Sequence, residues 1–183
     1  MTKLTAKEAA KAWREAECLC TEEQVQAAYD KMAKEITEDL HDKDPLILCV
    51  MTGGLIAAGH LLTRLAFPLQ IDYIHATRYN NTTQGNELQW LAYPRTPLKG
   101  RTVLIIDDIH DVGETLKRLV EHCRGEGAKA VYSAVLVNKL HDRKADFKAD
   151  YVGLEVGDHY VFGCGMDYRG YLRNAPGIYA VKE

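Results

Sequence analysis

The sequence predicts an α/β fold that contains a parallel sheet. An unbroken, mainly β-branched apolar run at residues 103–106 is typical of a strand that is covered on both faces. A segment with apolar residues at helical spacing follows it, at Leu116, Leu119, Val120 and Cys123. The chain has 183 residues, 46% of them hydrophobic and 27% charged, which is enough for one well-buried core and short for two. One α/β domain is therefore expected.

Two helices are expected at the start of the chain. Thr5 and Glu8 form a capping-box pattern before an alanine-rich helix that should run to about Glu17. Thr21 and Gln24 repeat this pattern before a longer helix. The apolar stripe of the longer helix should face the core and consists of Val25, Ala28, Tyr29, Met32, Ile36 and Leu40. We interpret both helices as scaffold.

The remaining elements are predicted from apolar runs and from turn residues. Besides the strand at 103–106, strands are expected at residues 46–51, 70–75, 88–93, 130–137 and 151–156. An apolar helix should follow the first of these at residues 55–65, and another helix should open at Gly113. The polar stretch 78–87 would form the tip of a long hairpin, whereas the charged stretch 141–150 is interpreted as a surface loop.

The charge of the chain excludes some classes of partner. A net charge of -3 argues against general binding to nucleic acids or to membrane surfaces, because both favour a basic protein. An acidic protein that binds a polyphosphate needs local help, such as a metal ion. No run of about 18 apolar residues is present, and the N-terminus lacks the hydrophobic core of a signal peptide. A soluble, cytoplasmic protein is the resulting prediction.

The cysteines predict neither disulfides nor a metal site. They are odd in number, lie in apolar patterns and are interpreted as reduced packing residues: Cys18, Cys20, Cys49, Cys123 and Cys164. A zinc site at Cys18, Cys20 and His41 is disfavoured because the spacing is wrong and a fourth ligand is missing.

The stretch around the predicted strand at 103–106 carries the strongest functional signal. Asp107 and Asp108 come where this strand should end, and Gly113, Glu114 and Thr115 open the next helix. In open α/β sheets ligands bind beyond the carboxyl ends of the strands, and a helix N-terminus offers unpaired N–H groups to a phosphate. This junction therefore predicts a site for a phosphorylated sugar, although acids and a glycine can also follow a strand for structural reasons alone.

A second possible phosphate site follows the predicted strand at 46–51. Thr52, Gly53 and Gly54 connect this strand to the next helix. Two adjacent glycines allow the backbone to approach a ligand closely and to present N–H groups at a helix start. The same pattern is also a common tight connection, so it is weak evidence by itself.

The stretch 107–115 contains, in this order, the acid pair, the acid at 111, a small residue and a hydroxyl. This arrangement resembles the phosphoribosyl diphosphate (PRPP) motif of type I phosphoribosyltransferases. The sequence departs from that motif at Val112, where threonine is usual, and at His110, where an aliphatic residue is common. The resemblance implies a largely parallel, twisted sheet flanked by helices, with a small hood formed by chain-terminal segments in a single domain over residues 1–183. It also implies a Mg²⁺ cofactor and a homo-oligomer, either a dimer or a tetramer.

The resemblance implies roles for the residues of both loops. Asp107 and Asp108 would contact the ribose and hold magnesium, and Asp111 would act as the general base at N7 of the base. The PRPP or ribose-phosphate site as a whole would consist of Asp107, Asp108, Asp111, Val112, Gly113, Glu114 and Thr115. Thr52 and Gly53 correspond to the diphosphate-binding loop, in which the family often has lysine or arginine at the first position. A cis peptide bond is expected between Met51 and Thr52 by the same resemblance.

A third stretch, 157–173, resembles the purine-binding hood of hypoxanthine-guanine phosphoribosyltransferases. Tyr160 would stack on the base, and Val161 would bond to it through its main chain. Asp167 would help to hold magnesium, and Arg173 would meet the diphosphate. Lys139, near the end of another predicted strand, corresponds to a lysine that bonds to the 6-oxygen of a purine.

A lid over the site is a further expectation. The family carries a mobile loop with a hydroxyl-aromatic pair at the place where this sequence has Arg78 and Tyr79. Such a loop would exclude water from an oxocarbenium-like transition state. The alternative is a plain solvated loop.

The expected function is purine salvage: conversion of hypoxanthine, guanine or both, with PRPP, to IMP or GMP and diphosphate, dependent on magnesium. Two alternatives remain open. One is a non-catalytic regulator on the same fold that binds PRPP or a nucleotide. The other is a transferase for a different base, such as xanthine, adenine or a pyrimidine. The preference among hypoxanthine, guanine and xanthine is not readable, because main-chain atoms mainly recognise position 2 of the purine.

Overall fold

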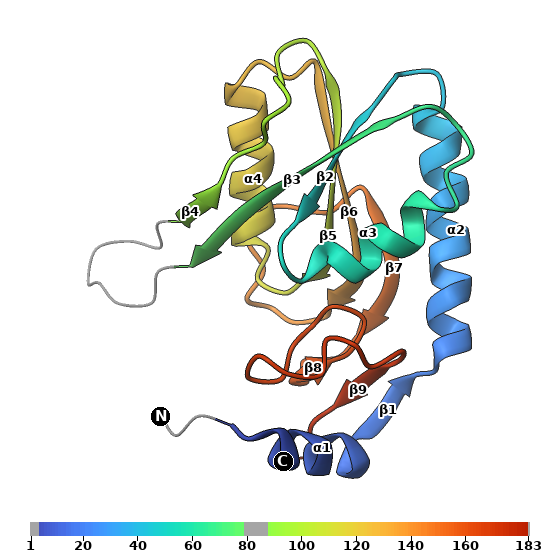
Figure 1. Cartoon of the computed structure of the whole chain (residues 1–183), viewed down its shortest axis with the longest axis vertical. Coiled ribbons are helices and arrows are strands. Elements are labelled where there is room, and N and C mark those ends of the chain that lie inside the picture. Colours follow the sequence, from blue (N-terminus) through green and yellow to red (C-terminus); the bar gives the residue numbers. More distant parts are fainter. Residues whose placement is uncertain (1–3, 79–87, 183) are drawn as a thin grey trace.

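The structure is a computed structural model, which describes residues 4–78 and 88–182. Two sheets and four helices make up this part of the chain (Figure 1). The elements are α1 (Ala6–Glu15), β1 (Glu17–Cys20), α2 (Glu22–Leu40), β2 (Leu46–Val50), α3 (Gly54–Leu62), β3 (Gln70–Arg78), β4 (Leu88–Ala92), β5 (Thr102–His110), α4 (Glu114–Gly125), β6 (Ala130–Lys139), β7 (Tyr151–Val156), β8 (Val161–Phe162) and β9 (Ile178–Ala180).

The main sheet has six strands in the order β4-β3-β2-β5-β6-β7. All neighbouring pairs are parallel except β3 and β4, which are antiparallel. This arrangement confirms the predicted fold class of a largely parallel sheet with flanking helices. The antiparallel pair confirms that the strands on either side of the polar stretch pair with each other, whereas the predicted hairpin tip at 79–87 lies outside the described residues.

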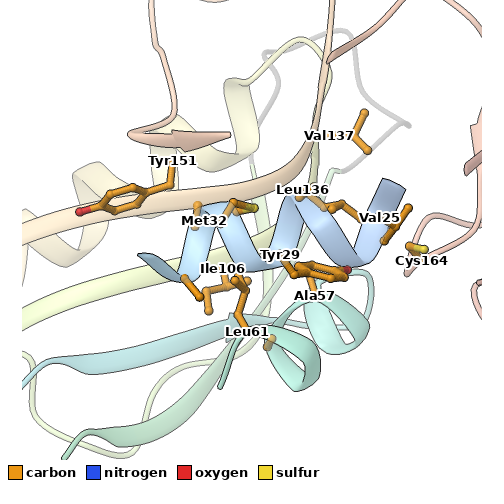
Figure 2. Packing of buried hydrophobic residues seen from close by; sticks show 14 of the residues in the cluster. Val25, Tyr29, Met32, Ala57, Leu61, Ile106, Leu136, Val137, Tyr151 and Cys164 are labelled. Atoms are coloured by element: carbon orange, nitrogen blue, oxygen red, sulfur yellow. The ribbon is translucent and has the colours of Figure 1, made fainter. Parts of the chain in front are cut away.

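Helices cover both faces of the sheet. Along β5, Leu104 and Ile106 pack in one cluster with α2 and α3, whereas Val103 and Ile105 pack in a second cluster with α4. The alternation explains the continuous apolar run, because side chains of successive strand residues point to opposite faces. Every residue predicted for the stripe of α2 is buried, and Figure 2 shows its Tyr29 among side chains from α3 and the sheet.

The small sheet forms from segments near both chain ends. Its order is β1-β9-β8, and all its pairs are antiparallel. With α1 it surrounds a third apolar cluster that includes Ala9, Phe162, Leu172 and Ala175. Figure 1 shows this sheet beyond the ends toward which the arrows of β6 and β7 point. It therefore stands over the carboxyl ends of the main strands.

Several of the predicted boundaries were wrong. The first helix ends at Glu15, because Ala16 is extended (ψ 153°) and the next residues form β1. The strand that carries the acid pair continues to His110, since Ile109 and His110 still pair with Val137 and Asn138 of β6. The acids therefore lie within the last part of the strand and not beyond it.

Lys139 likewise is the last residue of β6, where the prediction placed it two residues past the strand. The strand predicted at 70–75 extends to Arg78, because its last residues pair with β4. Strands β1, β8 and β9 were not predicted at all. Four of the five cysteines are buried as expected, but Cys18 is exposed on β1, and all five thiols are free.

Within residues 4–78 and 88–182, no helix is both long and apolar enough to cross a membrane.

Candidate active site

A cavity of about 430 Å³ lies at the carboxyl ends of the central strands. Its walls contain residues from the connection after β2, from β3, from the end of β5, from the start of α4 and from the segment after β8. The predicted site residues among them are Thr52, Gly53, Asp107, Asp108, Asp111, Gly113, Thr115, Asp167 and Arg173. Five segments that are distant in sequence are therefore brought to one cavity.

A smaller cavity of about 190 Å³ adjoins the first. The two share four lining residues: Asp108, Ile109, Asp111 and Asp167. The smaller cavity adds the three residues predicted to recognise a purine, Lys139, Tyr160 and Val161, together with Met166. The predicted base subsite and the predicted ribose-phosphate subsite are thus neighbours, with Asp111 on their boundary.

The acid pair lies on β5, which runs between β2 and β6 in the main sheet. The backbone N–H of Asp108 donates to Oδ1 of Asp107 at 2.9 Å, and Asp108 is only 8% exposed. Burial raises the pKa of Asp107 well above its usual value, and the neighbouring charge of Asp108 raises it further. Burial also raises the pKa of Asp108. Two adjacent carboxylates in such surroundings form an environment that favours a bound cation.

The connection after β2 packs directly against this pair. A Cβ at Gly53 would collide with the carboxylate of Asp108, and a Cβ at Gly54 would lie 2.6 Å from the carbonyl oxygen of Ile106. Both positions therefore require glycine. The peptide bond between Met51 and Thr52 is cis, as predicted.

The turn before α4 has the backbone geometry of an anion site. Gly113 has a positive φ of 88° and is the N-cap residue of α4, where it has no side chain to cap the helix start. The N–H groups of a first helical turn have no partner within the helix, so they can bind a phosphate. A Cβ at Gly113 would collide with the ring of the buried His110. The ring of His110, which stands where the motif commonly has an aliphatic residue, thus fills the space beside Gly113.

Two residues of the predicted turn do not line either cavity. The carbonyl oxygen of Val112 accepts a hydrogen bond from the N–H of Ala145 at 2.8 Å. The carboxylate of Glu114 lies 3.0 Å from Nε of Arg118, one turn along α4. At these two positions only the backbone can contribute to a phosphate site.

Asp111 is held by two basic side chains. Nε2–H of His141 donates to its Oδ1 at 2.7 Å, and Nζ of Lys139 lies 3.5 Å from its Oδ2. Burial raises the pKa of Asp111, but the hydrogen bond from His141 and the charge of Lys139 outweigh burial, so that the net pKa is lowered. Asp111 is therefore ionised near neutral pH. Lys139 also lies 3.4 Å from Oδ1 of Asp158.

His141 and Asp158 were missed by the sequence reasoning. The stretch 141–150 does lack helix and strand, as predicted, but His141 at its start is only 5% exposed and faces inward. A histidine in a charged stretch gives no local signal that it meets an aspartate 30 residues earlier.

The hood residues form the far wall of the smaller cavity. Tyr160 is 55% exposed, and its ring is nearly perpendicular (89°) to that of Tyr168, with the centroids 5.6 Å apart. An aromatic ring with this exposure can stack on a planar ligand. Val161 is buried at the start of β8.

Arg173 and Asp167 form an ion pair in the larger cavity. Nη2 of Arg173 lies 2.8 Å from Oδ1 of Asp167, and its Nη1 lies 3.9 Å from Oδ2 of Asp108. The carboxylate of Asp167 also accepts a hydrogen bond from the N–H of Gly170 at 2.6 Å. Of the predicted lid, Tyr79 lies outside the described residues, and so does the side chain of Arg78.

The predicted metal ligands fit a magnesium ion that takes only a few of its ligands from the protein. Asp107, Asp108 and Asp167 offer carboxylate oxygens to the same cavity, which are the donors that Mg²⁺ prefers. Over the described ranges, no three histidine, cysteine, aspartate or glutamate side chains form a ready-made cage. This donor set fits an ion that keeps most of its ligands as water or phosphate oxygen, as Mg²⁺ does at phosphate sites.

The sequence matches known proteins over most of its length. The profile of the phosphoribosyl transferase domain matches residues 20–169. A hypoxanthine-guanine phosphoribosyltransferase from Bacillus subtilis is 37% identical over 165 residues, which cover 90% of this chain and 92% of that protein. A hypoxanthine-guanine-xanthine phosphoribosyltransferase from Tritrichomonas foetus is 32% identical over 166 residues, 90% of this chain and 91% of that protein.

Solved structures agree with the sequence matches. A hypoxanthine phosphoribosyltransferase from Staphylococcus aureus superposes with a TM-score of 0.87 at 30% identity, over 93% of this chain and 94% of that one. The corresponding enzyme from Trypanosoma cruzi, in complex with its product IMP, gives 0.84 at 26% identity, over 92% and 95%. The chain therefore belongs to the phosphoribosyl transferase family and is an enzyme of the transferase class.

Proposed function

We propose that the protein converts hypoxanthine or guanine, together with PRPP, into IMP or GMP and diphosphate. The observation that carries this proposal is the pair of adjoining cavities with Asp111 between them. One cavity has the acid pair and a helix N-terminus for a ribose phosphate, and the other has a lysine and an exposed aromatic ring for a base. The names of the related proteins support the same pair of substrates.

The larger cavity would hold PRPP. The 5′-phosphate would bind to the backbone N–H groups of 112–115, and the ribose hydroxyls would lie against Asp107 and Asp108. The diphosphate would lie between the Thr52-Gly53 connection and Arg173, whose guanidinium can bind phosphate oxygens in a bidentate manner. Thr52 brings no cation where the family often has one, so the N–H groups of this connection would contribute more to diphosphate binding.

The smaller cavity would hold the purine. Nζ of Lys139 would donate to the 6-oxygen, the ring of Tyr160 would stack on the base, and the main chain of Val161 would bond to its edge. Lys139 is nearly buried, so its charge acts where little water screens it. A 6-oxo purine satisfies this lysine, whereas the 6-amino group of adenine would face it with another donor.

In the reaction N9 of the purine forms a bond to the anomeric carbon, and the bond from that carbon to the diphosphate breaks. The diphosphate leaves with the electron pair, and its negative charge is stabilised by Arg173 and the first turn of α3. The proton on N7 passes to the carboxylate of Asp111, which makes N9 the better nucleophile. The lowered pKa of Asp111 keeps it in the proton-accepting form near neutral pH.

A magnesium ion would be held by Asp107 and Asp108, with Asp167 as a further ligand once Arg173 has turned to the diphosphate. When bound, magnesium neutralises charge on the leaving group. The ion pair between Asp167 and Arg173 supports this arrangement, because each partner already lies in the cavity where its own ligand would bind.

The remaining expectations concern the whole chain. We propose one domain over residues 1–183 with a hood built from its terminal segments, a homo-oligomeric assembly as a dimer or tetramer, and a cytoplasmic location. Apolar side chains on β3 and β4 support self-association, since Ile71, Tyr73 and Leu91 are between 42% and 58% exposed.

A panel of bases tests the proposed reaction. The purified protein, PRPP and magnesium are incubated with radiolabelled hypoxanthine, guanine, xanthine, adenine and uracil, and nucleotide is measured. Nucleotide from hypoxanthine or guanine is expected. Nucleotide from adenine or uracil alone would assign a different base, and PRPP binding without any nucleotide would favour the regulator.

A further inference from the structure

The segment 141–145 lies alongside the turn that joins β5 to α4. Nζ of Lys144 donates to the carbonyl oxygen of His110 at 2.7 Å, and the N–H of Ala145 donates to that of Val112 at 2.8 Å. Between these two contacts, Nε2–H of His141 donates to Oδ1 of Asp111 at 2.7 Å. Three consecutive residues of the turn, 110, 111 and 112, are therefore each held by a separate hydrogen bond from one short segment.

The contact of His141 has a defined direction. The backbone N–H of Arg143 donates to Nδ1 of His141 at 3.1 Å, so Nδ1 must carry a lone pair. A neutral imidazole with an accepting Nδ1 has its proton on Nε2. His141 can therefore only donate to Asp111, and it cannot take a proton from it at Nε2.

Lys139 holds the other side of Asp111 less tightly. Its Nζ lies 3.5 Å from Oδ2 of Asp111 and 3.4 Å from Oδ1 of Asp158, both longer than a good charge-assisted hydrogen bond. The side chain of Arg143 in turn lies 2.6 Å from Oδ2 of Asp158. A purine that takes the ammonium of Lys139 would leave His141 as the main partner of Asp111.

We propose that His141 is a positioning residue for Asp111. Its Nε2–H fixes one carboxylate oxygen, and the other oxygen, next to Lys139, is presented to the purine and accepts the N7 proton. His141 does not line the base cavity and acts only through Asp111. This inference rests on the proposed function, because it assigns a role within that reaction.

The charges around Asp111 agree with this role. The basic groups that face it are Lys139 and His141, with Lys144 and His110 farther away. Two acids, Asp108 and Asp167, line the same two cavities. Burial alone would raise the pKa of Asp111. The hydrogen bond from His141 is the largest of the effects that lower this pKa. Without His141, Asp111 should bind its proton at a higher pH.

The test compares two substitutions of His141. In His141→Leu the donor is lost and the volume is roughly kept, whereas in His141→Gln an amide N–H can take the place of Nε2–H. The exposed His41, which is the C-cap residue of α2, provides the matched control His41→Leu. For each variant, kcat, the KM values for PRPP and hypoxanthine, and the pH profile of kcat/KM are measured, and Asp111 is titrated by carboxyl NMR.

We expect His141→Leu to lower kcat about ten- to a hundredfold, which corresponds to the loss of one hydrogen bond to a charged group. The KM for PRPP should change little, and the acidic limb of the pH profile should move to higher pH. His141→Gln should recover most of the rate and restore the limb, and His41→Leu should match the wild type.

The inference would be overturned if the wild type is active, the His141→Leu variant is equally active and the acidic limb of the pH profile does not move. This result would leave the proposed function intact. Equal losses in the leucine and glutamine variants without a change in the titration of Asp111 would also overturn it, because they indicate packing alone. A wild type that makes no nucleotide from any base would refute the proposed function, and the positioning role of His141 with it.

Discussion

At the scale of single residues, Asp111 connects the two halves of the site. It lines both cavities, and its carboxylate is held as an anion by His141 and Lys139. An anion at this position can accept a proton from a base while the sugar phosphate stays in place. Its role can therefore be separated from that of the phosphate turn.

We expect Asp111→Asn to bind PRPP normally but to lower kcat on the order of a hundredfold to ten-thousandfold, because an amide cannot accept the N7 proton. The amide oxygen can still accept the hydrogen bond from His141, so the local fold should persist. Steady-state kinetics and calorimetric titration with PRPP measure the two effects. Unchanged kcat would rule out the proton transfer to Asp111.

Gly113 and His110 form the second pair of residues that can be tested. Gly113→Ala should lower the free energy of unfolding by about 3 kcal/mol, because the new Cβ meets the ring of His110 and alanine disfavours a positive φ. In a His110→Ala background the cost should fall to about 1 to 2 kcal/mol, since only the backbone penalty remains. Chemical denaturation of all four proteins gives the coupling. Equal costs in both backgrounds would show that the ring does not occupy this space.

At the scale of elements, α2 organises the larger core. Its buried face packs in one cluster with residues of α3, β5, β6 and β7, and it includes Tyr29, which is fully buried (Figure 2). The hydroxyl of Tyr29 has no hydrogen-bond partner within the described ranges. The hydroxyl of Tyr151, a second buried tyrosine of this cluster, donates to Asp39 of α2 at 2.8 Å. The two tyrosines form a matched pair.

Tyr29→Phe should leave the free energy of unfolding unchanged or raise it by up to about 1 kcal/mol, because it removes an unsatisfied buried hydroxyl. Tyr151→Phe should lower it by about 1 to 2 kcal/mol, because a hydrogen bond to a carboxylate is lost. Equilibrium denaturation measures both values. A clear loss of stability in Tyr29→Phe would mean that its hydroxyl has a partner in solution.

The elements also show how far sequence patterns reach. Helix starts at Thr5 and Thr21 were predicted correctly, because both caps and their Glu8 and Gln24 partners lie within four residues. The ends of β5 and β6 were predicted too early. From Asp107 onward, β5 still pairs with β6, and this pairing is a contact between separate segments of the chain. A carboxylate in the sequence does not by itself end a strand.

At the scale of the whole molecule, the acid pair links stability to function. Both carboxyls have a raised pKa in the folded protein, mainly because of burial. Their protonated forms are therefore favoured by folding. That contribution is fully present below the unfolded pKa of 3.8 and is lost as pH rises through the raised folded values. At neutral pH, where the unfolded carboxyls are ionised, burial of this pair therefore lowers the stability of the ligand-free protein.

Asp107→Asn should raise the thermal stability of the ligand-free protein at neutral pH, by on the order of 1 kcal/mol, while it lowers activity with PRPP and magnesium. Thermal unfolding across a pH series measures the first effect, and the radiolabel assay measures the second. The stability gain should disappear below about pH 3.8, where both carboxyls are protonated in either state. A variant that is less stable than wild type at neutral pH would contradict this account.

Most of the site could be predicted because its main motif is local. Asp107, Asp108, Asp111 and Gly113 occur within seven residues of sequence, and strand, turn and helix place them in one cavity. Lys139, Tyr160 and Arg173 were assigned by resemblance, and the fold brings all three to the same pair of cavities. Their proposed roles await the tests above.

By itself the sequence determined the class of fold, the strand-turn-helix unit and the residue types that can bind a ribose phosphate, because apolar periodicity and backbone chemistry act over neighbouring residues. Only the tertiary structure decided that Glu17 pairs with Ala180 in a small sheet and that His141 holds Asp111. Such contacts join residues that are far apart along the chain. Their energies depend on packing and burial, which no local pattern records.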